Sequence, residues 1–326
     1  MGRHVVDAAL ARGHDVTLFN RGIHNPELFP EARRLTGDRH GDLQPLREGR
    51  WDAVIDTSGY TPQTVRAAAA ALADRARHYT FISTISVYEE AGDGQLNEDS
   101  DLLHLPDGAS DEVGPETYGP LKAAAEQVAQ EIFKDHCLVI RPGLIVGPHD
   151  PTDRFTYWPV RLDRGGEVLA PGVPDRTVQL IDVRDLARWL VDQVERQVTG
   201  VMNAAGPGSQ LTMASFLERC RQAVEAEAEL VWIDESFLLD AGVAPWTEIP
   251  LWLPKDMNAI MQVSIDRALA SGLTFRDLEE TARDTLSWHR GRPSSEILPT
   301  HGLNAARELA LLEAWRAQRE ARQETN

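Results

Sequence analysis

The chain has 326 residues, a length that one compact α/β body with a substantial core can use. Its composition, 42% hydrophobic and 26% charged, is that of an ordinary globular protein. The net charge of −18 argues against a nucleic-acid partner, because such binding depends on lysines and arginines that neutralise phosphates. No apolar run approaches the ~20 residues that cross a bilayer, so no membrane association is expected.

The first two-thirds of the chain alternates helix and strand signals, which is typical of a parallel sheet covered on both faces. An apolar stripe predicts a helix over 3–12, and an alanine-rich segment predicts another over 62–73. Short apolar runs predict strands at 15–19, 34–36, 53–56, 79–83 and 137–141.

Beyond residue 144 the pattern becomes irregular. It predicts a strand and helix over 178–194, a strand at 200–204, a helix near 212–226, a strand at 230–233 and a terminal helix over 303–326. The proline- and tryptophan-rich stretch 245–254 cannot be a regular helix throughout, and its tryptophans are interpreted as packing residues. The apolar side of the terminal helix must cover its own domain or a partner subunit, so a homodimer is left open.

The two cysteines provide no disulfide framework. Cys137 lies in a strand-like apolar run and is interpreted as a small buried hydrophobe. Met1 is not followed by a signal-like segment, so a reducing cytoplasm is the expected location.

A tyrosine and a lysine four residues apart, Tyr118 and Lys122, lie on one face of a predicted helix. A nearby ammonium favours the ionised phenol, which makes the tyrosine a better acid and base near neutral pH. Thr84 follows the strand at 79–83, and its hydroxyl is expected to hold a substrate oxygen beside Tyr118. The spacing alone is a weak signal, but the surrounding strands and loops strengthen it.

After this helix come the strand Cys137–Ile140 and the run Arg141–Pro148. In this order the motifs resemble the extended short-chain dehydrogenase/reductase superfamily, its NAD-dependent epimerase/dehydratase group. More narrowly, they resemble atypical bacterial members related to the chloroplast stem-loop-binding proteins. The resemblance covers roughly residues 2–290.

The resemblance implies an α/β fold, a Rossmann-type doubly wound parallel sheet with a smaller substrate domain built from insertions. The expected cofactor-binding domain comprises 1–143 with about 178–204. The expected substrate-binding region comprises 144–177 and 205–290, and 291–326 forms a C-terminal helical tail.

The resemblance also implies roles for single residues. Thr84 would orient the substrate, Tyr118 would act as acid and base, and Lys122 would anchor the cofactor ribose and lower the pKa of Tyr118. The expected cofactor-binding residues are Gly2, Asn20, Arg21, Asp42, Leu43, Thr57, Ser58, Gly59, Tyr118, Lys122, Pro142, Gly143 and Ile145.

The expected glycine-rich turn is incomplete at the N-terminus. Family members place three glycines between the first strand and the first helix, and only Gly2 corresponds to one of them. Two strands are therefore expected to flank a gap. Either the natural protein begins roughly ten or more residues upstream of Met1, or this short chain binds cofactor poorly. The intact downstream motifs favour the first explanation.

NADP is favoured over NAD as the cofactor. The position that usually carries an acidic residue for the ribose hydroxyls holds Asn20, Arg21 and Gly22 instead. An arginine at this place can bind a 2′-phosphate, although Arg21 is also explained as a surface turn residue.

The residues after Thr84 bear on the reaction type. Dehydratases of the superfamily place Asp-Glu there, whereas this chain has Ile85 and Ser86, so 4,6-dehydration is disfavoured. An epimerase or reductase acting on a sugar, nucleotide-sugar or similar small molecule is expected. The alternative is a non-catalytic NADP-binding or RNA-associated protein that retains the fold.

The segment 147–154 groups a histidine with carboxylates, but these are interpreted as loop-capping groups and no metal site is predicted. Arginines in a substrate cleft suit a phosphorylated or nucleotide-linked substrate, and surface salt bridges are the equal alternative. The candidate lining residues of such a cleft are Arg154, Tyr157, Trp158, Arg161 and Arg176.

Overall fold

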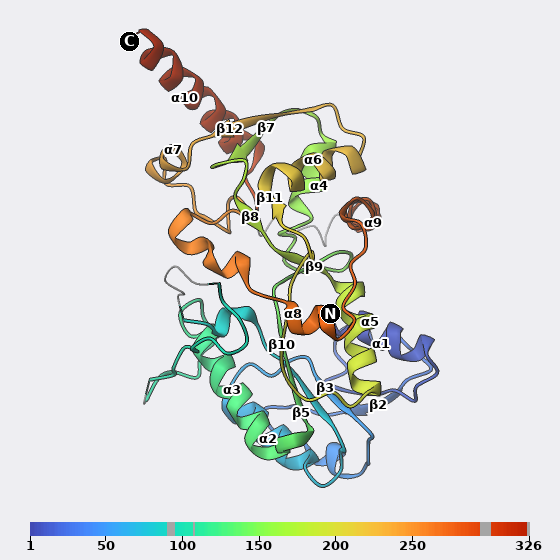
Figure 1. Cartoon of the computed structure of the whole chain (residues 1–326). Coiled ribbons are helices and arrows are strands. Elements are labelled where there is room, and N and C mark those ends of the chain that lie inside the picture. Colours follow the sequence, from blue (N-terminus) through green and yellow to red (C-terminus); the bar gives the residue numbers. More distant parts are fainter. Residues whose placement is uncertain (90–94, 107, 294–300, 325–326) are drawn as a thin grey trace. The chain divides into compact units, whose positions relative to one another are not determined.

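The computed structural model describes residues 1–89, 95–106, 108–293 and 301–324 (Figure 1). The chain forms two compact units. Unit 1 comprises Met1–Gly143, Val183–Gly206 and Val263–Thr274, and unit 2 comprises Leu144–Asp182, Pro207–Gln262 and Phe275–Asn326.

These units correct three of the predicted domain boundaries. Residues 178–182 belong to unit 2 because Leu180–Asp182 pairs with a strand of that unit. Val263–Thr274 returns to unit 1, and the terminal helix is part of unit 2 rather than a separate tail.

Unit 1 alternates helices and strands as the sequence predicts. Its helices are α1 (Gly2–Ala11), α2 (Pro62–Leu72), α3 (Tyr118–Phe133), α5 (Val183–Glu195) and α8 (Asp266–Ala270), with the 3₁₀ helices η1 (Gln44–Arg47), η2 (Ile85–Val87) and η3 (Lys134–His136). Its strands are β1 (Thr17–Asn20), β2 (Arg33–Thr36), β3 (Val54–Asp56), β4 (Tyr79–Ile82), β5 (Cys137–Pro142) and β10 (Gly200–Ala204).

The strands of unit 1 form two separate parallel sheets. One sheet has the order β10-β5-β4-β3, and β1 pairs only with β2 among the described strands. Val54 and Ile55 of β3 are only partly buried, whereas every residue of β4 is buried. The strand β3 is therefore an edge, and the sheet has the break that the sequence predicts.

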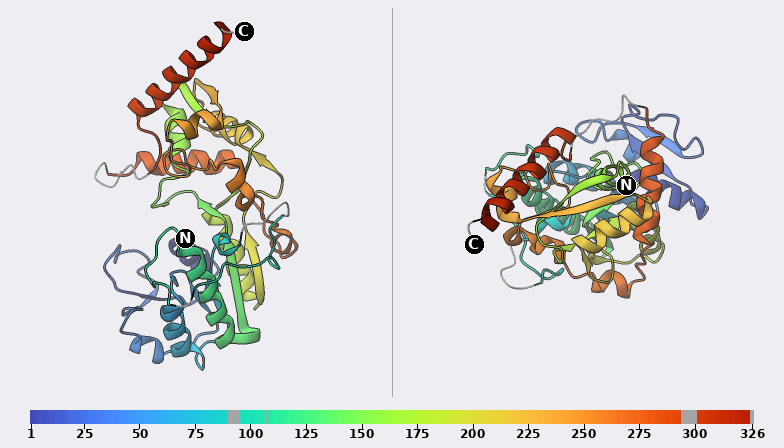
Figure 2. Two further views of the ribbon diagram at one scale, coloured as in Figure 1. Left: turned by 90° about the vertical axis from the view of Figure 1, so that its left-hand side faces the viewer. Right: turned by 90° about the horizontal axis from the view of Figure 1, so that it is seen from above.

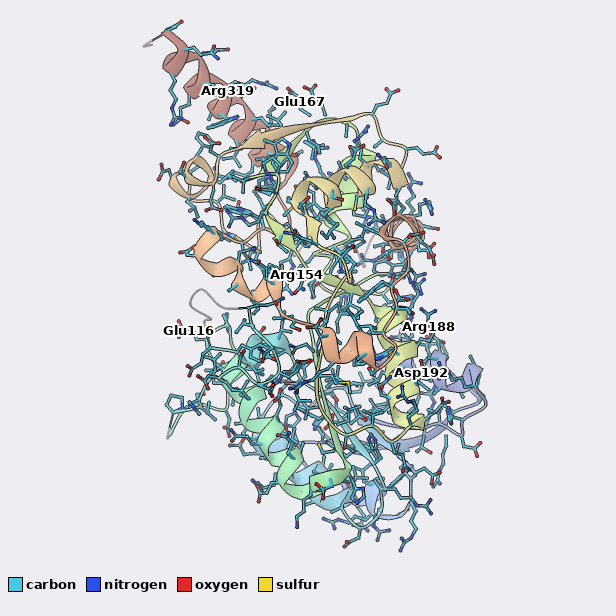
Figure 3. The ribbon with its side chains drawn as sticks, viewed as in Figure 1. Glu116, Arg154, Glu167, Arg188, Asp192 and Arg319 are labelled. Atoms are coloured by element: carbon cyan, nitrogen blue, oxygen red, sulfur yellow. The ribbon has the colours of Figure 1, made fainter. Side chains whose placement is uncertain are left out.

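Helices cover both sides of the larger sheet (Figures 1 and 2). On one side α2 and α3 pack together over an apolar cluster in which the rings of Tyr79 and Phe133 stack 4.5 Å apart. On the other side α1 packs against α5, which carries Asp192 (Figure 3). Arg12 pairs with Asp192 at 2.5 Å. The arrangement is the doubly wound sheet predicted from the sequence.

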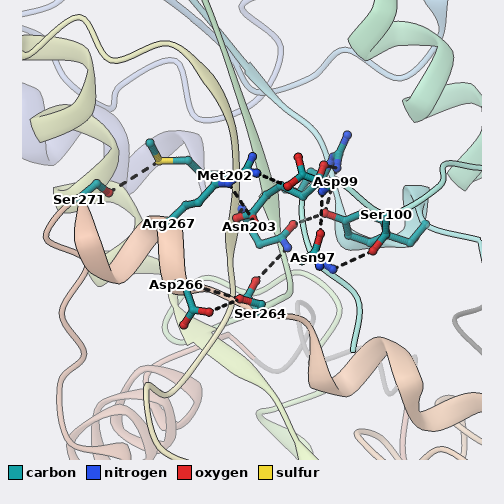
Figure 4. Close-up of polar contacts among 12 residues, drawn as sticks. Asn97, Asp99, Ser100, Met202, Asn203, Ser264, Asp266, Arg267 and Ser271 are labelled. Carbon is teal, nitrogen blue, oxygen red and sulfur yellow. Dashed lines mark hydrogen bonds and ion pairs between the residues drawn. The ribbon is translucent and has the colours of Figure 1, made fainter. Parts of the chain in front are cut away.

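A polar network attaches the returning segment Val263–Thr274 to the sheet (Figure 4). Asn203 of β10 donates from Nδ2 to the Ser264 carbonyl at 2.9 Å, and the Ser264 amide donates to the Leu96 carbonyl at 2.7 Å. Arg267 of α8 pairs with Asp99 at 2.5 Å. Unit 1 is thus completed by residues far along the chain.

Unit 2 contains smaller sheets and more irregular connections. Its strands are β6 (Leu144–Val146), β7 (Gly166–Pro171), β8 (Thr177–Val178), β9 (Leu180–Asp182), β11 (Leu211–Thr212) and β12 (Ala228–Ile233). Its helices are α4 (Tyr157–Asp163), α6 (Met213–Ala223), α7 (Glu235–Asp240), α9 (Leu278–Arg290) and α10 (Ala305–Glu324), with the 3₁₀ helix η4 (Lys255–Gln262). β6–β9 and β7–β12 are parallel pairs, and β8–β11 is antiparallel.

Large aromatic side chains fill the core of unit 2. Trp158 and Trp252 are fully buried, and Trp158 Nε1 donates to the Pro250 carbonyl at 2.9 Å. The interpretation of Trp252 as a packing residue is confirmed. The terminal helix α10 buries Leu311, Leu312 and Trp315 in this core, so its apolar side packs on its own chain.

Both cysteines are buried free thiols, in agreement with the structural interpretation of Cys137. Burial raises the pKa of Cys137 to about 12. None of the described helices combines the length and apolarity that a membrane crossing requires.

Candidate active site

The candidate substrate-binding hydroxyl lies where β4 ends. The buried run Tyr79–Ile82 delivers the chain to Thr84, whose extended backbone begins η2. Thr84 Oγ1 accepts a hydrogen bond from the Ser86 amide and donates one to Ser86 Oγ, both at 3.2 Å. Ser83 Oγ, by contrast, is buried and has no hydrogen-bond partner among the described residues.

The helix α3 begins at Tyr118, and its start is held by a turn. Thr117 Oγ1 donates to the Glu112 carbonyl at 2.6 Å and accepts from the Gly114 amide at 2.8 Å. A Cβ on Gly119 would lie only 2.3 Å from the Ser86 carbonyl oxygen. Glycine at this position therefore lets the first turn of α3 pack directly against η2, which brings the Tyr118 and Thr84 segments together.

Lys122, one turn into α3, lies in a buried position at the carboxyl ends of β3 and β4. Its side chain donates to the carbonyl oxygens of Gly59 and Ile82, both at 2.6 Å. The ammonium also lies 4.1 Å from the centre of the Phe81 ring. Burial lowers the pKa of Lys122 from 10.5 to about 8, so the side chain is mostly protonated at neutral pH but close to losing its charge.

A buried ion pair holds α3 against the sheet beside this site. Glu126, one turn after Lys122, bonds to Arg141 of β5 at 2.7 Å. Arg141 Nη1 also donates to the Tyr88 hydroxyl at 2.9 Å, and that hydroxyl donates to Asn203 at 2.6 Å. Because each polar group has partners, the network fixes the rotation of α3 and with it the direction of Lys122.

The predicted ribose segment follows β3 and meets the N-terminus of α1. A Cβ on Gly2 would lie 3.6 Å from Thr57 Oγ1, so the first residue of α1 is adjacent to Thr57. Ser58 donates its amide to Asp56 at 3.1 Å, and Gly59 presents its carbonyl to Lys122. The structure therefore brings Gly2, the segment 57–59 and Lys122 to one edge of unit 1.

The predicted adenosine segment follows β1 and β2. The Gly37 amide donates to the Asn20 carbonyl at 3.1 Å, which connects the ends of the two strands. Arg21 is exposed, and Asp42 accepts the Gln44 amide at 3.2 Å to begin η1. Leu43 packs against the apolar cluster of unit 1.

The third predicted cofactor segment begins at the end of β5. The Gly143 amide donates to the Ala204 carbonyl at 3.0 Å, which holds Pro142 and Gly143 beside β10. Ile145 lies in β6 of unit 2, paired with Ile181 of β9. Unit 1 thus contains every predicted cofactor residue except Ile145.

Residues 61–192 match the family model NAD_binding_4, described as Male sterility protein. No curated protein has a detectably similar sequence. Three solved structures with the same arrangement are UDP-glucose 4-epimerase from Thermotoga maritima with UDP-glucose (17% identity, TM-score 0.64), UDP-glucuronic acid 4-epimerase from Bacillus cereus in complex with NAD (17%, 0.61) and UDP-glucose 4-epimerase from Thermus thermophilus in complex with NAD (17%, 0.61). The first two alignments cover 89% of this chain and 95% of the other, and the third covers 90% and 96%.

The chain shares the fold of these epimerases. At these identities the likeness to the epimerases is one of fold. The sequence prediction of an α/β fold with a Rossmann-type parallel sheet is confirmed.

Sequence reasoning missed a partly buried ion pair between Arg39 and Asp56 in unit 1. The signals were an aspartate that ends an apolar strand and an arginine two residues after Gly37. Neither residue belongs to a motif, and their contact depends on how the loops after β2 and β3 fold.

The loop after β6 contains capping groups, as the sequence interpretation expected. Asp150 accepts hydrogen bonds from the amide and the hydroxyl of Thr152, at 2.9 and 2.8 Å. Asp153 pairs with Arg292 at 2.8 Å. Among the residues the structure describes, no group of three or more His, Cys, Asp or Glu side chains could hold a metal ion.

The residues considered for the substrate cleft have different surroundings. Trp158 is a core residue, and Arg161 forms a buried ion pair with Glu308 at 2.6 Å. Arg176 donates through Nη2 to Glu235 at 2.9 Å, but its buried Nη1 has no partner among the described residues. Arg176 therefore keeps hydrogen-bonding capacity, whereas Arg161 has a structural role.

Proposed function

We propose that this chain is an NADP-preferring oxidoreductase or epimerase that acts on a hydroxyl or carbonyl group of a sugar, nucleotide-sugar or similar metabolite. The observation that carries the proposal is the position of Lys122, whose ammonium lies against the carbonyl oxygens of Gly59 and Ile82. These oxygens mark the carboxyl edge of β3 and β4, where ligands of parallel α/β sheets bind.

The residues at this edge fit a nicotinamide adenine dinucleotide. The buried Ser83 hydroxyl, adjacent to Ile82, has no partner in the described part of the chain, and a bound ligand could supply one. Lys122, Thr57 and Gly59 would hold the ribose and nicotinamide portion. The N-terminus of α1 at Gly2 would face the diphosphate, because a helix N-terminus favours negative charge.

The bound cofactor supplies a carbon that accepts or donates a hydride. Tyr118 exchanges the proton on the substrate oxygen, and the charge on Lys122 favours the ionised phenol. Thr84 orients that oxygen through its hydroxyl. The side chain after Thr84 is the buried, apolar Ile85, which cannot transfer a proton, so water elimination is not proposed.

The preference for NADP is supported by the end of β1. Asn20 uses its side-chain oxygen to accept the Gly22 amide at 2.8 Å, and no carboxylate follows in this turn. The exposed Arg21 is available to pair with a 2′-phosphate. The NAD complexes named above belong to other proteins of the same fold, so a direct comparison of the cofactors is needed.

The substrate class of the proposed reaction can be tested directly. A panel of nucleotide sugars and simple carbonyl compounds, followed by NADPH absorbance or product analysis, would identify the substrate.

The experiment that tests the proposal is the substitution Tyr118→Phe. It should lower turnover by ~10²–10⁴-fold, because the proton-transfer group is lost, while NADPH binding measured by fluorescence is not abolished. Full turnover in this variant would refute the acid/base role. Binding of NADPH without turnover by the unaltered protein on any substrate would favour a non-catalytic binding protein.

The cofactor preference has its own test. Replacing Arg21 by Ala should weaken NADPH binding by roughly tenfold and leave NADH binding unchanged, because only NADPH carries the 2′-phosphate. Tighter binding of NADH than of NADPH by the unaltered protein would refute the preference.

A further inference from the structure

The Arg39–Asp56 pair is a clamp at the carboxyl edge of unit 1. Arg39 donates from Nη1 to Asp56 Oδ1 at 2.9 Å and from Nη2 to Oδ2 at 3.0 Å. Asp56 also accepts the Ser58 amide at 3.1 Å and the Tyr79 hydroxyl at 2.8 Å. The side chains of Arg39 and Asp56 are 16% and 9% exposed, so the two-point contact is largely shielded from water.

The clamp joins loops from the two separate sheets. Arg39 lies in the loop 37–42 after β2, whereas Asp56 ends β3. Among the described strands, neither β1 nor β2 pairs with β3. Hydrogen bonds between sheet strands therefore do not connect these two loops. The guanidinium provides that connection, and its Nη1 also donates to Ser58 Oγ at 3.0 Å.

Each end of the clamp continues into a predicted cofactor segment. In the loop 37–42, the Asp38 amide donates to the Asp42 carbonyl at 3.1 Å and the Gly37 amide donates to the Asn20 carbonyl at 3.1 Å. At the other end, Ser58 is adjacent to Gly59, whose carbonyl accepts the Lys122 ammonium. A continuous path of bonds thus runs from the adenosine segment to the candidate catalytic helix.

We propose that Arg39 is a positioning residue for the dinucleotide: by holding Asp56 it orders the loop 37–42 and the segment 57–59 before the cofactor binds. This inference rests on the proposed cofactor site and assigns no contact between Arg39 and the cofactor. Loops ordered in advance lose less conformational entropy on binding, so the clamp increases affinity through preorganisation.

The test compares three variants by NADPH titration at a temperature where each is folded. The double variant Arg39→Met/Asp56→Asn removes the clamp without leaving one buried charge unpaired. We expect it to weaken NADPH binding by about tenfold or more. Arg39→Lys keeps the charge but loses the two-point contact, so its affinity should be intermediate.

Tyr79→Phe is the matched control. It removes one hydrogen bond to Asp56 and leaves both loops clamped, so stability should fall while NADPH affinity stays within about twofold. If the network had only a structural role, Tyr79→Phe and the double variant would change the NADPH affinity by the same factor. That result would overturn the proposal.

Amide hydrogen exchange without cofactor gives a second measurement. In the double variant, or in Arg39→Lys if the double variant does not fold, amides of 37–42 and 57–59 should exchange about tenfold faster than in the unaltered protein. Unchanged exchange would overturn the proposal. If the unaltered protein binds neither NADPH nor NADH, the proposed function fails, and the exchange rates still decide whether the clamp orders the loops.

Discussion

The charge on Lys122 should make folding stability depend on pH in a specific way. Burial lowers the pKa of this lysine to about 8 in the folded chain, against 10.5 when it is exposed. Between these values the unfolded chain binds more protons, so stability rises with pH. The unfavourable contribution is absent above pH 10.5, grows as pH falls and is complete below pH 8, where it reaches about 3 kcal/mol.

The assay compares the unaltered protein with Lys122→Met by urea unfolding, followed by tryptophan fluorescence. The methionine also changes contacts to Gly59 and Ile82, but that change does not depend on pH. Between about pH 7 and pH 10, the unaltered protein should gain about 2.5 kcal/mol in unfolding free energy relative to the variant.

Lys134→Met is the control, since Lys134 is exposed just beyond the C-terminal end of α3. Its stability should follow that of the unaltered protein across the same pH range. A constant or falling difference between the unaltered protein and Lys122→Met from pH 7 to pH 10 would refute the assignment of a buried, easily deprotonated lysine.

Three further substitutions test other contacts. Glu126→Gln should lower the unfolding free energy by ~3–5 kcal/mol in denaturant titration, because Arg141 would remain charged and buried at a former 2.7 Å ion pair. Gly59→Ala should cost ~1–3 kcal/mol and lower the melting temperature, since the new methyl group would lie 2.6 Å from the Phe81 ring. Arg66→Met removes an exposed ion pair, so its melting temperature should equal that of the unaltered protein. A stability loss for Arg66→Met as large as that of Glu126→Gln would contradict these assignments. Unchanged stability in Glu126→Gln or in Gly59→Ala would contradict them as well.

Local patterns were sufficient to predict most of unit 1. Apolar runs identify the strands from 79–83 to 200–204, because a strand buried on both faces has few polar positions. The four-residue spacing of Tyr118 and Lys122 places them on one helical face for the same local reason. The structure contains these elements and puts both residues on α3.

Contacts between distant segments could not be predicted in this way. Arg39 is only 16% exposed because the loop after β2 contacts the end of β3. A periodic sequence pattern does not predict such a contact. The same holds for Leu180–Asp182, which pairs with β6 in unit 2 although its sequence looks like a strand of the main sheet. In the sequence, Ser83 cannot be distinguished from the neighbouring hydroxyl residues. In the structure, its side-chain oxygen is buried and has no hydrogen-bond partner among the described residues.

The return of Val263–Thr274 to unit 1 affects how the protein can be synthesised and divided. The side-chain amide of Asn203 donates to the Ser264 carbonyl, and the Ser264 amide donates to the Leu96 carbonyl. During synthesis these bonds can form only after the segment Pro207–Gln262 of unit 2 and the residues that follow it have left the ribosome. A fragment that ends at Gly206 would expose these buried polar groups and the surface beneath α8. A shortened chain that keeps unit 1 intact therefore has to include Val263–Thr274 as well as the earlier segments of that unit.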